Sequence, residues 1–316
     1  RRVRVHLPAD MQTTTSWEAV AAEVAGHESV LAIVGTRKAA RELQRLMPEG
    51  TLHLSALMCG AHRKDVIAHI KERLKAKREG RDTRPLRVVS TQLVEAGVDI
   101  DFPVVYRALA GLDSIAQAAG RCNREGRMEG LGRVVVFVPP ERPPLGHLRK
   151  GADACISTLH GQAQDPQHDP LARGLFARYF TEFYHSVDLD QHRVVNLLTV
   201  QPRDLAVKFR TAADAFRLID DADSATVVVR YAAHQQHIES LLNTLVAEGP
   251  QRWLMRKLQR YTVTIPKRVA DKMLQQGDLT LPMPGLYVQA DTDNLYDAQL
   301  GLKLVDDVYN PSGFAP

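Results

Sequence analysis

Six short strand-like runs alternate with helix-like segments over the first 140 residues, and this alternation limits the possible folds more than any other feature. Two of the runs, Val3–Leu7 and Leu52–Leu54, have the length of a strand. The other four also have the apolar character of buried strands: Val30–Val34, Leu86–Ser90, Val104–Ala108 and Val134–Val138. Helices are expected at 15–25, 38–46, 64–78 and 114–124. Because strands joined through helices run parallel, the pattern predicts an α/β fold with a doubly wound parallel sheet.

Two proline pairs end this pattern and predict a domain boundary. Pro139-Pro140 and Pro143-Pro144 follow the last apolar run. We therefore expect a first lobe at 1–143, a helical linker region at 144–250 and a small α+β C-terminal domain at 251–316. Beyond the boundary, helices are expected at Leu171–His185, Arg210–Ile219, Arg230–Ala247 and Lys267–Gln275. Strands are expected there at Ala225–Val229, Tyr261–Ile265, Gly285–Val288 and Gly301–Val305.

The composition is that of a globular protein. Of the 316 residues, 44 % are hydrophobic and 25 % are charged, which suits about two domains with cores of ordinary size. The longest apolar runs are strand-sized and no signal peptide is recognisable, so we expect no membrane contact and a cytoplasmic location. The chain opens on Arg1 within a strand-like run, which favours a piece of a longer protein.

Positive charge is concentrated in the first lobe. Residues 1–140 carry 22 Lys and Arg against 16 Asp and Glu, whereas the rest of the chain carries 19 against 21. A basic lobe followed by a near-neutral tail suits a polyanionic partner such as a nucleic acid.

No metal site is expected. His168-Asp169 lies between prolines without further ligands, and His234 and His237 have helical spacing but no third ligand. The cysteines fit neither a metal site nor a disulfide framework, so we expect each to be a small core or surface residue rather than a nucleophile. They are Cys59, Cys122 and Cys155.

The most specific chemical signal is a polar stripe within residues 113–124. On the expected helix, Gln117, Arg121 and Arg124 lie at positions i, i+4 and i+7 and share one face. Two guanidinium groups on one face suit phosphate oxygens. An arginine that neutralises a transferring γ-phosphate typically accelerates its hydrolysis by about 10³ to 10⁵. The alternative is a solvated face with surface ion pairs to Glu125 and Glu129.

A second signal lies upstream, where the run at residues 86–90 ends in two hydroxyls. Ser90 and Thr91 are expected at the carboxyl end of a parallel strand, where such sheets bind ligands. Hydroxyls there can hold a phosphodiester. Gly97 ends a short helical turn, and Asp99 directly after it could accept a hydrogen bond from a ribose hydroxyl. The alternative is an ordinary strand, turn and helix with a capped aspartate.

These two segments resemble motifs V and VI of superfamily 2 helicases. The motif V resemblance covers Ser-Thr-Gln-Leu-Val-Glu-Ala-Gly-Val-Asp at 90–99, and the motif VI resemblance covers Gln-Ala-Ala-Gly-Arg-Cys-Asn-Arg at 117–124. Ile-Val-Gly-Thr-Arg at 33–37 is similar to motif IV. Leu-Ser-Ala-Leu-Met-Cys-Gly-Ala-His-Arg at 54–63 resembles a segment in which the family usually has Met-x-x-x-His-Arg. The spelling is most similar to the helicase–nuclease effector of type I CRISPR systems, in particular its type I-C branch.

The resemblance implies a RecA-like second helicase lobe and a role for each site residue. Arg124 would be the arginine finger, Arg121 its neighbour on the γ-phosphate, and Gln117 a sensor of the nucleotide state. Gly97 and Asp99 would meet the ribose of ATP. A single-stranded DNA track would be lined by Thr36, Arg37, His62, Arg63, Ser90 and Thr91.

The resemblance also implies partners. The chain lacks a phosphate loop and an acidic Mg²⁺-binding run, so ATP and Mg²⁺ would be held mainly by the other motor lobe of the helicase, outside this chain. That other motor lobe and a nuclease domain would belong to the same protein, which would follow a crRNA-guided surveillance complex (Cascade) onto single-stranded DNA. Two alternatives remain open: a superfamily 2 translocase unrelated to CRISPR, and a DNA- or protein-binding module that turns over no ATP by itself.

Overall fold

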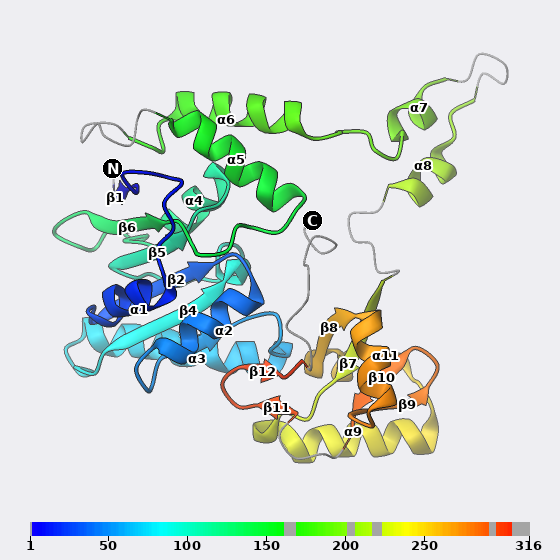
Figure 1. Cartoon of the computed structure of the whole chain (residues 1–316). Helices are drawn as coiled ribbons and strands as arrows, with labels where there is room; N and C mark the ends of the chain where they lie inside the picture. The colour runs from blue at the N-terminus through cyan, green and yellow to red at the C-terminus, as the bar shows by residue number, and fades with distance from the viewer. Residues whose placement is uncertain (1, 161–168, 201–205, 217–222, 291–294, 305–316) are drawn as a thin grey trace.

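The first lobe contains one six-stranded sheet in which neighbouring strands are all parallel, as the sequence predicts. The computed structural model describes residues 2–160, 169–200, 206–216, 223–290 and 295–304. The strand order is β1-β6-β5-β2-β4-β3 (Figure 1). The strands are β1 (Val3–His6), β2 (Ser29–Val34), β3 (Leu52–Leu54), β4 (Leu86–Thr91), β5 (Val104–Ala108) and β6 (Gly132–Phe137). Each expected apolar run forms a strand within two residues of its predicted bounds.

Helices cover both faces of this sheet, and the side chains of β2 show why. Leu31 and Ile33 belong to the core on the face of α3 and α4, whereas Val30, Ala32 and Val34 belong to the core on the face of α1 and α2. A strand buried on both faces must be apolar throughout, which explains the unbroken run in the sequence. The four helices are α1 (Trp17–Ala25), α2 (Arg37–Leu46), α3 (Gly60–Arg78) and α4 (Leu112–Ala119).

The predicted helix at residues 114–124 is wrong in its extent. Helix α4 ends at Ala119, and Gly120 is its C-cap. The chain then turns back to the sheet, where Cys122 forms a parallel bridge with Phe102. Asn123 follows with a φ of 43°, a value that no helix allows. Backbone pairing with the segment before β5 therefore replaces the last helical turns.

This shorter helix changes the predicted polar stripe. Gln117 lies on α4, but Arg121 and Arg124 lie in the turn after it, so the three side chains do not share a helix face. The helix also begins earlier than predicted, at Leu112, with Gly111 as its N-cap.

Helices α5 and α6 pack onto the first lobe. Cys155 and Leu159 of α5 and Tyr179 of α6 join the core on the α4 side of the sheet. The Tyr179 hydroxyl donates a 2.7 Å hydrogen bond to Asp113. Figure 1 shows α7 and α8 beyond the end of α6. The linker helices are α5 (His147–Leu159), α6 (Arg173–Ser186), α7 (Val194–Leu198) and α8 (Phe209–Ala215). The three domain limits stay a prediction.

A second unit follows, with a four-stranded sheet of order β8-β7-β10-β9 and a two-stranded sheet of β11 and β12. Only β7 and β10 pair in parallel among its described strands. The strands are β7 (Ser224–Val228), β8 (Thr262–Pro266), β9 (Leu279–Met283), β10 (Leu286–Gln289), β11 (Tyr296–Asp297) and β12 (Gly301–Leu302). The helices are α9 (Gln235–Glu248), α10 (Arg252–Leu258) and α11 (Lys267–Gln275). Short 3₁₀ turns are η1 (Gln92–Val94), η2 (Ala232–His234) and η3 (Gln259–Tyr261).

The two units share a core. Leu57, Cys59 and Ala61 of the first lobe are buried among the apolar residues of the second unit. Figure 1 shows β11 and β12 on the side of the second unit that is nearest to α3. The start of α3 therefore lies between the two units.

Candidate functional site

The carboxyl ends of β2 and β4 bring the predicted DNA-track residues together. The two strands pair in register, with Ile33 opposite Ser90 and Val34 opposite Thr91. Thr36 follows β2 and caps α2 by accepting a 3.0 Å hydrogen bond from the backbone N–H of Ala39. Because parallel strands end at the same edge of a sheet, the motif IV and motif V segments lie side by side.

The two hydroxyl side chains at the end of β4 differ in their accessibility to a ligand. The Ser90 side chain is fully buried and donates to the backbone carbonyls of Leu54 and Thr91, at 3.2 and 2.9 Å. Its hydroxyl therefore fixes the strand end and has no free surface for a phosphate in this arrangement. Thr91 reaches the surface slightly, at 8 % exposure.

The motif V and motif VI segments meet at two arginines. Arg124 Nη1 lies 3.4 Å from a carboxylate oxygen of Asp99, and both side chains are substantially exposed, at 44 % and 66 %. The backbone N–H of Arg124 donates a 2.7 Å hydrogen bond to Asp101. The backbone of Arg124 is thus fixed while its guanidinium remains accessible, an arrangement that suits a group that meets a ligand.

Arg121, unlike Arg124, is largely inaccessible to a ligand. Its side chain is buried, and Nη2 donates a 2.6 Å hydrogen bond to the backbone carbonyl of Glu95. Burial lowers the pKa of Arg121, and the neighbouring Arg124 lowers it further. The carbonyl of one motif therefore holds the guanidinium of the other.

A buried ion pair between Glu95 and Arg107 lies behind these groups, and sequence reasoning missed it. Arg107 Nε lies 2.7 Å from Glu95 Oε1, with side-chain exposures of 0 % and 6 %. Burial raises the pKa of Glu95, whereas Arg107 and a hydrogen bond from Ser114 lower it. One signal was available: Arg107 is a charged residue inside an apolar strand run, and such a residue needs a buried partner.

Gln117 and Gly97 are both exposed. Gln117 lies near the end of α4, three residues before its C-cap. Gly97 has a φ of 71° and an open surface around its Cα, so it makes the turn between η1 and Asp99 that other residues adopt only with strain. Their predicted nucleotide contacts stay predictions.

His62 and Arg63, the remaining predicted track residues, lie in the first turn of α3. His62 is 2 % exposed and its ring stacks on Tyr231, with centroids 4.5 Å apart. Its Nδ1 lies 2.9 Å from the Tyr296 hydroxyl. This burial leaves the His62 ring no surface for DNA and favours a packing role. Arg63 is half-buried at the neighbouring helical position.

All three cysteines are free and buried. Burial raises the pKa of both Cys122 and Cys155 to about 12, so neither is a thiolate nucleophile near neutral pH. Of the predicted His168-Asp169 pair, His168 lies outside the described residues. Within the described part of the chain, no group of three potential metal ligands occurs and no helix is long and apolar enough to cross a membrane.

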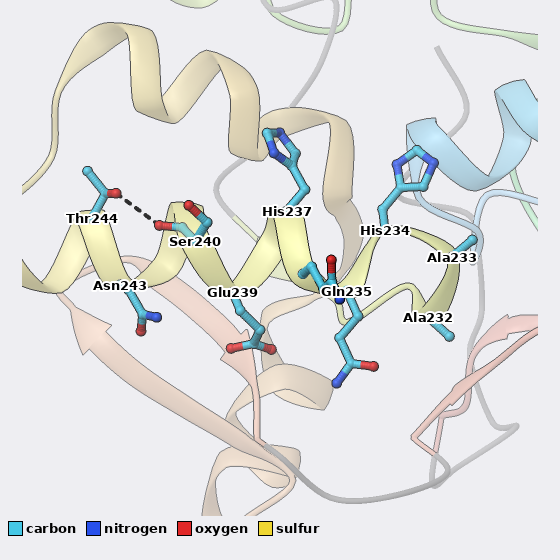
Figure 2. Close-up of a pocket in the computed structure, with 10 residues that line it drawn as sticks. Ala232, Ala233, His234, Gln235, His237, Glu239, Ser240, Asn243 and Thr244 are labelled. Atoms are coloured by element: carbon cyan, nitrogen blue, oxygen red, sulfur yellow. Dashed lines mark hydrogen bonds between the residues drawn. The ribbon is translucent and has the colours of Figure 1, made fainter.

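An open groove of about 1220 Å³ runs along α9 (Figure 2). His234, at one end, lies 3.1 Å from the Tyr261 hydroxyl through Nδ1 and 3.4 Å from Asp65 of α3 through Nε2. His237 packs edge-on against the same tyrosine. His234 therefore belongs to the contact between the two units.

A family model described as "CRISPR-associated nuclease/helicase Cas3, C-terminal" matches residues 28–127. This part of the chain is similar to the C-terminal region of Cas3 proteins. The match includes the motif IV, V and VI segments and both arginines of the site. The predicted resemblance to the CRISPR helicase–nuclease is confirmed at the level of the family, and the type I-C branch stays a prediction.

Two curated Cas3 proteins are similar to this chain. The Haloferax volcanii Cas3 is 34 % identical over 155 residues, which is 44 % of this chain and 15 % of the relative. The Methanothermobacter thermautotrophicus Cas3 is 27 % identical over 246 residues, which is 67 % of this chain and 29 % of the relative. The matched part thus spans less than a third of either relative.

Solved structures show the same fold. A Cas3 crystal structure from T. fusca has a TM-score of 0.60 at 16 % identity and covers 96 % of this chain and 43 % of its own. A T. fusca Cas3–ATP structure has a TM-score of 0.57 at 19 % identity, covering 97 % and 41 %. A structure described as a CRISPR RNA-guided surveillance complex, pre-nicking, gives 0.54 at 17 %, covering 96 % and 44 %. The Cas3-type α/β architecture therefore extends over the described chain.

Proposed function

We propose that this chain is the second motor lobe and C-terminal region of a longer Cas3-type protein that moves on single-stranded DNA with hydrolysis of ATP. The observation that supports this most strongly is the contact between the motif V and motif VI segments. Arg124 lies beside Asp99, and Arg121 is hydrogen-bonded to the Glu95 carbonyl. The two motif VI arginines, which are expected to meet ATP, thus contact the motif V segment, which begins at the edge of the proposed DNA track.

Within this proposal, Arg124 is the arginine finger. Its accessible guanidinium would neutralise charge that develops on the γ-phosphate. Arg121 would support it from the protein side, because its guanidinium already donates to a backbone carbonyl. Gln117, Gly97 and Asp99 would line the same nucleotide cleft.

The DNA track would follow the carboxyl edge of the sheet. Thr36, Arg37, Thr91 and Arg63 would bind backbone phosphates, and Ser90 would shape the strand end from within the core. Contacts of this kind are tolerant of sequence and weaken as salt concentration rises.

ATP and Mg²⁺ would be held mainly by the other motor lobe of the longer protein, which is not part of this chain. The structural similarity to a T. fusca Cas3–ATP complex supports nucleotide use. Similarity to a chain in a CRISPR RNA-guided surveillance complex supports a Cascade-type partner, and hence type I CRISPR interference as the setting. Unwinding and degradation of target DNA would then require the nuclease domain of the same protein.

ATP hydrolysis by the full-length protein, measured against single-stranded DNA concentration, tests this proposal. We expect hydrolysis to be stimulated by the DNA, and Arg37→Ala to raise the DNA concentration for half-maximal rate by about fivefold or more. Arg45→Ala, in the last turn of the same helix, is the matched control and should behave as wild type. A wild-type rate that ignores single-stranded DNA would overturn the proposal.

A further inference from the structure

Helix α3 begins without a cap from its own sequence. Its N-cap is Cys59, whose side chain makes no capping hydrogen bond. The first backbone N–H groups of a helix lack partners within the helix, and a side chain normally accepts from them. The absence of a capping residue also explains why the sequence predicts this helix only from Lys64, four residues after its observed start at Gly60.

The second unit supplies an acceptor for one of these N–H groups, that of the N-cap residue itself. The hydroxyl of Tyr296, on β11, accepts a 2.9 Å hydrogen bond from the backbone N–H of Cys59. In a capping box, a glutamate or glutamine three residues into the helix accepts from this same N–H. Here the acceptor comes from a residue 237 positions later in the chain.

His62 connects this cap to the second unit. Its Nδ1 lies 2.9 Å from the same Tyr296 hydroxyl, and its ring is also hydrogen-bonded to the backbone of Ala298. One proton assignment satisfies these bonds. The ring donates to the Ala298 carbonyl, Nδ1 accepts from the tyrosine O–H, and the tyrosine oxygen accepts from Cys59. Burial lowers the pKa of His62, which favours the neutral ring that this assignment requires.

Backbone atoms of the second unit also contact the start of α3 and the residues just before it. The N–H of Leu302 donates a 2.8 Å hydrogen bond to the carbonyl of Leu57. A Cβ at Gly301 would lie 2.3 Å from that carbonyl oxygen, and one at Gly60 would lie 3.3 Å from the carbonyl oxygen of Arg260. At the next turn of α3, Asp65 lies 3.4 Å from His234, whose position at the end of the groove is visible in Figure 2.

We propose that the second unit completes the first turn of α3 through Tyr296 and His62, and thereby positions Arg63 for single-stranded DNA. This inference rests on the proposed function for the role of Arg63. The turn starts after β3, at the edge where Ser90 binds the β3 carbonyl of Leu54, so it adjoins the proposed track. His62 and Tyr296 are thus positioning residues, and Arg63 is the residue that meets the ligand.

The test uses the full-length protein with two readouts: amide hydrogen exchange at residues 59–64, and affinity for a labelled oligothymidylate. Tyr296→Phe removes only the hydroxyl. We expect it to speed exchange by about twofold to tenfold, the loss of one hydrogen bond, and to weaken DNA binding by a similar factor. Tyr287→Phe is the matched control, because its hydroxyl bonds Asp271 within the second unit. It should change neither readout.

A double variant separates positioning from a general loss of structure. If Tyr296 acts through Arg63, the Tyr296→Phe/Arg63→Ala protein should bind DNA no more weakly than Arg63→Ala alone. Both single variants should lower the slope of log affinity against log salt, by up to about 0.7, the value for one single-strand phosphate contact.

Each contrary outcome has a separate meaning. Unchanged exchange in Tyr296→Phe would overturn the capping of α3 by the second unit. Faster exchange with wild-type DNA affinity, or additive losses in the double variant, would overturn the positioning of Arg63. Wild-type affinity in Arg63→Ala would instead refute its place in the proposed DNA track, while exchange still decides whether Tyr296 caps the helix.

Discussion

At the scale of single residues, Gly111 shows how closely the linker region packs on the first lobe. A Cβ at this position would lie 2.3 Å from the Tyr179 hydroxyl and 2.4 Å from Asp113, two groups that are hydrogen-bonded to each other. Gly111→Ala should therefore destabilise the protein by about 1–3 kcal/mol. Thermal unfolding measures this. Gly174→Ala, in α6 with open space around its Cα, is the control and should be neutral or stabilising. Equal melting temperatures for the two variants would refute the packing argument.

At the scale of elements, the Glu95–Arg107 pair joins the motif V turn to β5. Removing one partner leaves an uncompensated buried charge, which typically costs about 3–5 kcal/mol. We expect Arg107→Met to lose that much in urea unfolding, and Glu95→Gln/Arg107→Met to recover part of the loss because neither charge then remains. Additive losses in the double variant would show that the two side chains are not coupled in the folded state.

Some secondary-structure elements could be predicted from the sequence and others could not. Strand β2 is buried and apolar along its length because helices cover both faces of the sheet, and such a run can be recognised in the sequence. The end of α4 and the start of α3 could not be predicted in this way. The first depends on a backbone bridge between Cys122 and Phe102, and the second on a hydroxyl from Tyr296. Phe102 and Tyr296 are distant in sequence from the helix ends that they affect, so local helix propensity cannot predict these ends.

In the candidate site, too, some features could be predicted from the sequence motifs and others depend on tertiary contacts. The motif spelling predicted Arg124 and Asp99 as neighbours of one cleft, and the structure brings their side chains within 3.4 Å. The motif sequences could not show that Arg124 is exposed whereas Arg121 is buried. Nor could they show that His62 is buried beside Arg63, which we propose to face the ligand. Burial depends on the second unit and on long-range contacts, which the motif itself does not contain.

At the scale of the whole molecule, buried histidines make stability depend on pH. Burial, with a smaller contribution from Arg41, lowers the pKa of His53 to about 4, and burial also lowers that of His62. Both pKa values are below the unfolded value, so the unfolded chain binds more protons in acid. Their stabilisation is therefore complete above about pH 6.5 and is lost as pH falls towards 4, by on the order of 3 kcal/mol for His53. Unfolding at pH 7.5 and pH 5 measures this, and equal stability at both values would contradict it.

In the proposed function, Arg124 stabilises the transition state of ATP hydrolysis on the longer protein. Steady-state hydrolysis by the full-length protein with saturating single-stranded DNA tests it most directly, through the separate effects on kcat and KM of Arg124→Ala. Arg127→Ala is the control, an exposed arginine three residues later that pairs with Glu125. We predict that Arg124→Ala lowers kcat by about 10³ or more, with KM for ATP changed much less, while Arg127→Ala matches wild type. A kcat for Arg124→Ala within a fewfold of wild type would contradict the account.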